Sequence, residues 1–474
     1  MAIQSAAPAS RDPARAPGDR VSSAGDRVSS AGDPAPATRR AMRERSIDGA
    51  RDALWMATAV PAPAFEPLGG DARCDVAIVG AGFTGLNAAL RLARGGADVR
   101  VLEARHPGYG ASGRSGGQIN MGLNLLPSAL IERFGRERGE RLIRLVVGTP
   151  GTVRRTVEEN GLDCDLAMKG WVQGAATPGM LRSQHRMAED YAAHGGRFDV
   201  LDAPAFAAAS GAEGYLGGLH CATAGSLHPL SYTRELARVA MAAGGAIHRD
   251  TPVTALSRQG TRWRLATPHG TVTAEHVVIA TNGYTDALVP GLRERIVPVR
   301  SVLVASEPLP ERVRATLMPG GVTFVDKRRI TLYARYDRDG RLAIGDHGPM
   351  RDTFALADFK RLKRRARRTF PQLRDVRWDF HWGGRVAMTR ASLPFLAELG
   401  PGLSAGMGYN GRGVGMATVM GRALAAHADG GDADAVGFPV TTPGAYPFHA
   451  FHPLGVWLGV RWFGLLNAVG RLRG

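Results

Sequence analysis

Cysteine is scarce in this chain of 474 residues: it occurs only at Cys74, Cys164 and Cys221. The three lie far apart, form no C-x-x-C pair and have no histidine pair at metal-ligand spacing, so neither a disulfide framework nor a metal site is indicated. We therefore expect a reducing, cytoplasmic location. The chain also has no apolar N-terminal signal segment and, before its last segment, no run of about 20 uncharged apolar residues. These absences argue against secretion and a membrane span.

Lysine is scarce as well, so the formal net charge of +17 comes almost wholly from arginine. Only Lys169, Lys327, Lys360 and Lys363 are present. Such an excess could indicate nucleic acid, anionic lipid or acidic substrates as partners. Because the arginines are spread along the chain, we interpret it as a bias in composition. The densest basic cluster, residues 360–368, has no interleaved aromatic residues for base stacking, which favours a solvated helix face over a nucleic-acid site.

The two ends of the chain differ in composition from the rest. Residues 1–47 are rich in Ala, Pro, Ser, Arg and Asp, and a seven-residue motif at 18–24 is repeated at 25–31. Such a segment buries too little apolar surface to offset the entropy of ordering, so we predict a disordered tail. Residues 446–474 place aromatic residues among leucines and predict an amphipathic segment, which lies at a membrane surface or packs on the protein itself.

The most informative stretch is residues 75–103. A β-branched run leads into Gly80, Gly82 and Gly85 in G-x-G-x-x-G spacing, a helical segment follows, and a second apolar run ends at Glu103. In such a βαβ unit the first glycine makes a tight turn, the second lets a pyrophosphate approach the backbone, and the third lets helix pack on strand. The acid can accept the hydroxyls of a ribose. The stretch predicts a dinucleotide-binding site.

Three later clusters also favour a bound ligand. Residues 108–118 form a second glycine cluster, in which Ser112 supplies a donor and Arg114 a charge. Residues 280–283 end an apolar strand at a loop, where the backbone can approach a ligand at the carboxyl edge of a sheet. Residues 408–414 form a glycine turn that opens an Ala-rich helix, and a helix N-terminus of this kind can bind an anion.

Short alternating runs at 298–309 and 322–345 predict an antiparallel sheet, which a purely Rossmann-like chain would not need. With this sheet and the glycine clusters, the chain from about Asp52 onward resembles the FAD-dependent oxidoreductases of the D-amino-acid oxidase superfamily, and within it the gamma-glutamylputrescine oxidoreductase-like branch. The motifs that carry the resemblance lie at residues 75–86, 111–118, 228–230, 280–284, 382–384 and 408–414.

The resemblance implies an α/β fold in two domains. The first is a discontinuous, Rossmann-type FAD-binding domain of the glutathione-reductase-like kind, formed by residues 72–122, 225–292 and 383–430. The second is an α+β substrate domain built on an antiparallel sheet, formed by residues 123–224 and 293–382.

The resemblance also implies a set of contacts with FAD. Gly80, Gly82 and Gly85 would lie at the pyrophosphate, Glu103 at the adenosine ribose, and Val253 at the adenine. Ser112, Gly113, Arg114, Gly117 and Gln118 would lie along the ribityl chain and flavin ring, and Ala280, Thr281 and Asn282 near the pyrophosphate. Gly411, Arg412 and Gly413 would bring a helix N-terminus to the pyrimidine edge of the flavin, where positive charge stabilises the reduced ring.

The implied reaction is oxidation of a C–N bond in an amine or amino acid, in which a hydride passes to flavin N5 and the resulting imine hydrolyses. No dedicated base is required, and none is assigned. Ser115 stands where the branch commonly has Asn. Sarcosine-oxidase relatives carry an oxygen-activating lysine where this chain has Ala343, so either oxygen or another acceptor reoxidises the flavin. A cysteine linkage to the flavin has no counterpart, so we expect non-covalent FAD.

Candidates for substrate contact are Tyr333, Arg335, Trp382 and Arg385, since an arginine can clamp a carboxylate and aromatic side chains can wall the flavin face. Two other functions compete with a cytoplasmic amine oxidoreductase. One is a membrane-surface flavin dehydrogenase that passes electrons to a quinone through residues 446–474. The other is a basic nucleic-acid-binding protein with a vestigial nucleotide fold.

Overall fold

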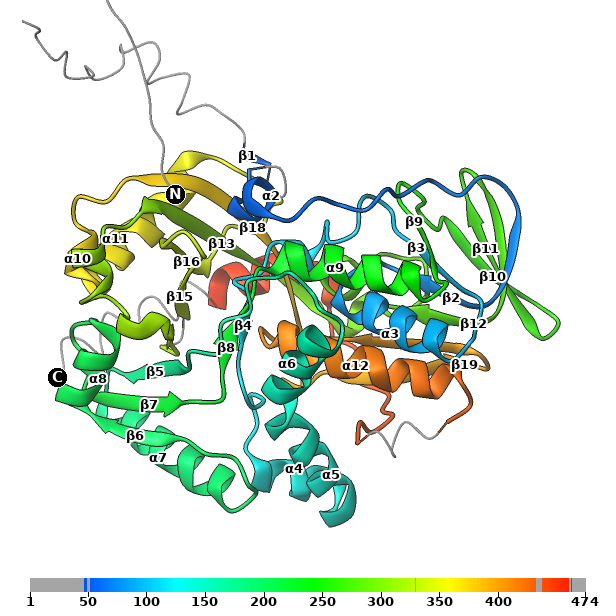
Figure 1. Ribbon diagram of the computed structural model, residues 1–474. Helices are drawn as coiled ribbons and strands as arrows, with labels where there is room; N and C mark the ends of the chain where they lie inside the picture. The colour runs from blue at the N-terminus through cyan, green and yellow to red at the C-terminus, as the bar shows by residue number, and fades with distance from the viewer. Residues whose placement is uncertain (1–46, 49–51, 329, 432–436, 460–461, 463–474) are drawn as a thin grey trace, which may run out of the picture. The chain divides into compact units, whose positions relative to one another are not determined.

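The computed structural model describes residues 47–48, 52–328, 330–431, 437–459 and 462 (Figure 1). The predicted disordered tail lies outside these residues except at its last position, where β1 (Ile47–Asp48) pairs with β17 (Thr353–Phe354). A short helix, α2 (Leu54–Thr58), precedes the first long strand and buries Trp55 completely.

The predicted βαβ unit is present as β2 (Ala72–Val79), α3 (Phe83–Arg94) and β3 (Val99–Leu102). Alternate side chains of a strand point to opposite faces. In β2, Val76 and Ile78 therefore belong to the core beneath the helices, whereas Ala77 and Val79 belong to the core on the other face of the sheet. Burial on both faces explains why this strand is an almost continuous apolar run.

The first sheet has the strand order β10-β11-β12-β2-β3-β9, with β20 also paired to β12 and β19 to β20. Neighbours among β9, β3, β2, β12 and β20 are parallel, and β10, β11 and β19 pair antiparallel. The remaining bounds are β9 (Ala246–His248), β10 (Ala255–Gln259), β11 (Arg262–Thr267), β12 (Gly270–Ile279), β19 (Phe395–Gly400) and β20 (Leu403–Met407).

Three helices lie side by side against this sheet: α9 (Pro229–Ala242), α3 and α12 (Gly413–Ala428) (Figure 1). α6 (Thr149–Glu159) packs on α12 and follows α4 (Pro127–Phe134) and α5 (Arg136–Val147). The N-termini of α3 and α12 both follow glycine turns, so each begins beside a segment of backbone that carries little side-chain bulk.

The second sheet has the order β18-β13-β16-β15-β14-β5-β7-β6, in which all neighbours are antiparallel except β14 and β5. Its strands are β5 (Trp171–Ala175), β6 (Asp199–Asp202), β7 (Gly217–Cys221), β13 (Val297–Pro308), β14 (Thr323–Asp326), β15 (Leu332–Tyr336), β16 (Arg341–His347) and β18 (Trp378–Met388). α11 (Lys360–Thr369) contacts β13 and β16, and α8 (Ala203–Ser210) contacts β5 and β7.

Further elements are α7 (Pro178–Ala192), α10 (Glu311–Arg314), β4 (Gln118–Ile119) and β8 (Gly225–Ser226).

The mixed α/β fold is the one expected, and the antiparallel sheet predicted from 298–309 and 322–345 is confirmed. The boundaries of the two predicted domains stay a prediction, because residues 43–474 group as one unit and β18 crosses the proposed boundary at residue 383. None of the helices in the described part of the chain combines the length and apolarity that crossing a membrane requires.

Candidate functional site

A cavity of about 1300 Å³ lies where the carboxyl ends of β2 and β3 and the start of α12 meet the second sheet. It exceeds the roughly 300–1,000 Å³ of an ordinary small-molecule site, so a dinucleotide and a substrate can share it. Fourteen of the sixteen residues predicted to contact the cofactor line this cavity: Gly80, Gly82, Glu103, Ser112, Arg114, Gly117, Gln118, Val253, Ala280, Thr281, Asn282, Gly411, Arg412 and Gly413. Gly85 and Gly113 do not line it.

The first glycine turn explains where these residues lie. Gly80 has φ +106°, a conformation that side chains rarely adopt. A Cβ at Gly82 would lie 2.8 Å from the Ser112 Oγ, and a Cβ at Gly85 would overlap the carbonyl oxygen of Gly80. Gly85 therefore allows α3 to pack against the turn, and it shapes the cavity without lining it. Gly113 acts similarly, since a Cβ there would overlap the carbonyl oxygen of Gly108.

Glu103 is fixed at the end of β3 by the backbone around it. Its Oε2 accepts a hydrogen bond from the Ala81 N–H at 2.9 Å, and its Oε1 accepts one from the Arg105 N–H at 3.0 Å. Burial raises the pKa of Glu103, and the two backbone donors partly oppose that shift. The carboxylate thus lies directly beside the glycine turn, where it keeps unused lone pairs for ribose hydroxyls.

The second glycine cluster is tied to the first by side chains. Ser112 Oγ accepts from the Phe83 N–H at 2.9 Å, at the start of α3. Arg114 is buried, donates from Nε to the Tyr109 carbonyl at 2.7 Å, and stacks on the Tyr109 ring at 4.4 Å. Gln118 donates from Nε2 to the carbonyls of Phe324 and Ala334, so its amide also joins the cluster to the second sheet.

The clusters from the middle and the end of the chain meet directly. Asn282 Oδ1 accepts from the Gly408 N–H at 2.9 Å, which joins the loop after β12 to the turn before α12. In that turn Gly411 has φ +84°, and Arg412 is buried with its Nη1 donating to the Met121 carbonyl at 2.8 Å. Burial lowers the pKa of Arg412. A cation and the N-terminus of α12 therefore reach the same part of the cavity.

The four predicted substrate contacts divide into two pairs. Tyr333 and Arg385 line the cavity. Tyr333 Oη lies 2.8 Å from Ser301 Oγ, and Arg385 forms a bidentate ion pair with Asp352 at 3.0 and 2.6 Å.

Arg335 and Trp382 do not line the cavity. Arg335 Nη1 donates to the Leu227 carbonyl, and its guanidinium stacks on Trp55 at 4.7 Å. Trp382 is fully buried and donates from Nε1 to the Arg114 carbonyl at 3.0 Å. Both side chains support the wall of the site from behind.

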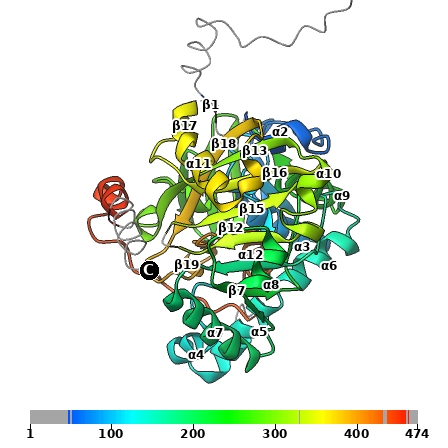
Figure 2. The ribbon, with the colours of Figure 1, turned by 90° about the vertical axis from the view of Figure 1, so that its left-hand side faces the viewer.

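Several lining residues are absent from the sequence-based candidates, among them Asn120, Trp171, Tyr284, Arg300 and Lys327. A further part of the wall is formed by residues 446–459. The predicted amphipathic segment therefore packs on the protein on one side, while Phe448 and Phe451 remain 84% and 67% exposed. Figure 2 shows its helix, residues 452–459, in red at the edge of the ribbon. The rest of the predicted segment, apart from residue 462, lies outside the described residues.

Some of the residues that line the cavity carry buried polar atoms without a hydrogen-bond partner in the described part of the chain. Arg114 Nη2, Asn120 Oδ1 and Trp171 Nε1 are buried and have no partner within the described part of the chain. Buried polar atoms are almost always hydrogen-bonded, and the flavin and ribityl groups of FAD offer both donors and acceptors. The residues present therefore fit FAD. The three cysteines are all buried and none of them lines the cavity, whereas non-covalent attachment itself stays a prediction.

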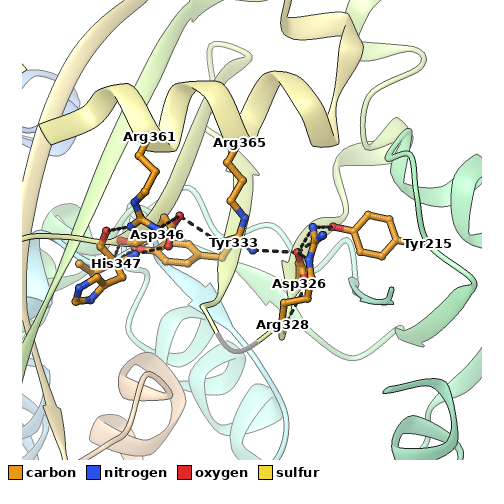
Figure 3. A network of polar contacts seen from close by, with 9 residues as sticks. Tyr215, Asp326, Arg328, Tyr333, Asp346, His347, Arg361 and Arg365 are labelled. Atoms are coloured by element: carbon orange, nitrogen blue, oxygen red, sulfur yellow. Dashed lines mark hydrogen bonds and ion pairs between the residues drawn. The ribbon is translucent and has the colours of Figure 1, made fainter. Parts of the chain in front are cut away.

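A network of charges lies behind the second sheet (Figure 3). Asp326 and Asp346 are buried, and Arg365 of α11 bonds to both, at 3.0 and 3.1 Å. Arg361 also approaches Asp346, at 3.6 Å, and donates to the His347 carbonyl at 2.6 Å. Arg365 is therefore turned inward to neutralise buried carboxylates, while Lys360, Arg361, Arg364, Arg367 and Arg368 are exposed along one side of α11, which confirms the predicted solvated face.

Comparison with known proteins agrees with this geometry. The family model described as FAD dependent oxidoreductase matches residues 75–427. A probable oxidoreductase, OrdL, of Haemophilus influenzae is 30% identical over 417 residues, covering 85% of this chain and 94% of the relative. Gamma-glutamylputrescine oxidoreductase of Escherichia coli is 30% identical over 364 residues, covering 76% and 85%. Among solved structures, glycine oxidase of Geobacillus kaustophilus has a TM-score of 0.66 at 24% identity, covering 76% and 96%. The chain belongs to the FAD-dependent oxidoreductase family whose members act on amines and amino acids.

Proposed function

We propose that this protein oxidises a C–N bond of a small amine or amino acid to an imine, which water then hydrolyses. The observation that supports the proposal is the shared cavity, which joins the glycine turns of the first sheet to polar side chains of the second. Bound FAD supplies the hydride acceptor at N5. The scarcity of cysteine favours a cytoplasmic location for this enzyme.

The chain's own residues would bind and orient the reactants. The guanidinium of Arg412 and the N-terminus of α12 would supply positive charge that stabilises the negative charge of a reduced flavin. On the opposite wall, Tyr333 is held by Ser301, so its ring can limit the position of a substrate. These groups would hold the substrate and the flavin in position and keep water away from them, and they form no covalent bond with the substrate.

The substrate that we propose carries a carboxylate. Arg300 and Arg385 both line the cavity and both pair with Asp352, which leaves this part of the wall with one unbalanced positive charge. An arginine is suited to bidentate recognition of a carboxylate. Gamma-glutamyl amines combine a carboxylate with an oxidisable amine, and a relative is named for such a substrate. We therefore include that class.

The test uses purified protein loaded with FAD and a panel of amines under anaerobic conditions. We expect bleaching of the flavin absorbance near about 450 nm by at least one amine that carries a carboxylate, and formation of the corresponding carbonyl compound after hydrolysis. A protein that retains FAD and is not reduced by any amine or amino acid would contradict the proposal.

A second candidate is a membrane-surface dehydrogenase that passes electrons to a quinone. It is favoured by residues 446–459, where Phe448, Phe451 and Leu454 line the cavity and are yet 84%, 67% and 55% exposed. Changing these three residues to Ser should abolish flotation with anionic vesicles and reduction of a vesicle-bound quinone in a variant that still holds FAD. Absence of vesicle binding by the unchanged protein would exclude this candidate and leave oxygen or a soluble acceptor.

A further inference from the structure

Lys327 is a cavity-lining residue at the end of β14. Alternation along the strand places Val325 and Lys327 toward the cavity, and Asp326 between them toward the buried core behind the sheet. The sheet therefore presents a primary amine to the same space as Arg412 and Tyr333.

The amine of Lys327 has no counterion within the described part of the chain, where the only charge that acts on it is that of Arg412. Within the described residues it forms no hydrogen bond and no ion pair, although its side chain is half-buried. The neighbouring carboxylate of Asp326 is already occupied, since Arg328 and Arg365 donate to it at 2.6 and 3.0 Å. Even at half burial a cation without a partner loses part of its hydration, so the neutral amine is favoured.

The charged groups around Lys327 favour the same protonation state. Burial and the positive charge of Arg412 lower the pKa of Lys327 to about 7. Tyr333, on the neighbouring strand β15, stays neutral because burial raises its pKa. Arg335 on the same strand is directed to the Leu227 carbonyl, and β5 on the other side carries no charged residue. No side chain on the described strands β15 and β5 therefore supplies a negative charge that would stabilise the ammonium form of Lys327.

We propose that Lys327 is the base that removes a proton from the substrate's ammonium group before oxidation. This inference depends on the proposed amine oxidation. The substrate R–NH₃⁺ transfers one proton to the Lys327 Nζ, which gives R–NH₂ and a lysine ammonium. The proton later leaves to solvent, and no bond to carbon is made or broken in this step.

The reaction needs such a group because only the neutral amine has a lone pair to stabilise the developing imine. An alkylamine with a pKa of about 10 is roughly one part in a thousand neutral at pH 7. A base whose pKa lies near the working pH is efficient, and general bases contribute about 10²–10⁴-fold. Oxidation by this chain would thereby proceed near neutral pH.

The chain offers a direct test of the lysine itself, because it contains only four lysines. With lysine labelled by ¹³C at Cε, the FAD-loaded protein should give four signals, and Lys327→Met and Lys169→Met assign two of them. We expect the Lys327 signal to titrate near pH 7, well below the usual pKa of a lysine. A Lys327 signal that titrates near pH 10 would overturn the proposal without any assay of activity.

The second test is the rate of anaerobic flavin bleaching against pH. Lys327→Met should lower the rate at pH 7.5 by about 100-fold and restore it toward pH 10, where the substrate loses its proton to solvent. Lys169→Met, the matched control, should behave as the parent. Lys327→Arg should not restore the rate at pH 7.5. Restoration by Arg would show that positive charge is required, and would overturn the assignment as a base.

The two proposals fail in different ways. If no amine bleaches the parent protein, the proposed function fails. If amines bleach the parent and Lys327→Met keeps both its rate and its pH profile, only the role of Lys327 fails.

Discussion

Arg365 of α11 and Asp326 of β14 form an ion pair of 3.0 Å between Nη2 and Oδ2, directly behind the cavity wall (Figure 3). The same guanidinium donates from Nη1 to Asp346 of β16 at 3.1 Å. One side chain thus fastens a helix to two strands of the second sheet. It also neutralises the carboxylate next to Lys327, so that the lysine amine faces the cavity with no counterion among the described residues.

Removing this guanidinium should destabilise the protein. In Arg365→Met, Asp326 keeps Arg328 and Asp346 keeps Arg361, so we expect a loss of about 3 kcal/mol in the free energy of unfolding, the low end for a broken buried pair. Urea unfolding measures this loss. Arg364→Met, on the exposed face of the same helix, is the control and should change the free energy by less than about 0.5 kcal/mol. Equal losses in the two variants would contradict the prediction.

His228 should make the folded state sensitive to acid. It caps α9, where its Nδ1 accepts from the Ser231 N–H at 3.1 Å, and burial lowers its pKa to about 3. In the unfolded chain the His228 imidazole binds a proton with a pKa of about 6.5. The contribution of His228 to the stability of the folded state is therefore complete above that pH and is lost as the pH falls below it. Lowering the pH from 7.5 to 5 should therefore reduce the free energy of unfolding by about 2 kcal/mol through His228 alone.

The check on His228 is urea unfolding at both pH values. His228→Asn keeps a good N-cap and removes the titrating group. We expect the difference in unfolding free energy between pH 7.5 and 5 to be about 2 kcal/mol smaller in the variant than in the parent. A difference that the substitution leaves unchanged would assign the acid sensitivity to other groups.

Local patterns in the sequence were sufficient to predict the first sheet and the glycine turns that line the cavity. The run before Gly80 is apolar because the strand is buried on both faces, and the glycines are required by backbone conformation and by close packing. Both features can therefore be recognised from the residue types alone. Gly85 and Gly113 show the limit of this reasoning. The motif predicts that Gly85 lets helix pack on strand, as it does, whereas the ligand contacts that the family resemblance implies for Gly85 and Gly113 stay a prediction, because both residues allow two backbone segments to meet behind the cavity.

The opposite wall of the cavity could not be predicted in the same way. Tyr333 and Arg335 lie on the same strand two residues apart, yet only Tyr333 lines the cavity, because Trp55 from a distant helix and the Leu227 carbonyl engage the arginine. Lys327 has no motif around it. Its low pKa depends on burial and on Arg412, which is 85 residues away in the chain.

Arg335 should therefore act on stability and not on substrate binding. Arg335→Met removes the hydrogen bond to the Leu227 carbonyl and the stacking on Trp55, which should lower the free energy of unfolding by about 2 kcal/mol. Michaelis constants for amine substrates should change less than about twofold. The loss of a charged hydrogen bond to the substrate would raise them by much more. A large rise in those constants at unchanged stability would return Arg335 to the list of substrate contacts.

Arg385 should instead affect selectivity for charge. Its guanidinium and that of Arg300 share Asp352, so Arg385→Met removes the unbalanced positive charge from this wall. We expect the Michaelis constant for a substrate with a carboxylate to rise about tenfold, and that for the matching neutral amide to change less than about twofold. Arg385 also lies 4.9 Å from the Tyr284 ring at the cavity, so the FAD content of each preparation must be measured by absorbance. Exposed Arg390, changed to Met, is the control for a general effect of lost positive charge. Equal effects on the acid and the amide would mean that Arg385 shapes the cavity and does not recognise a carboxylate.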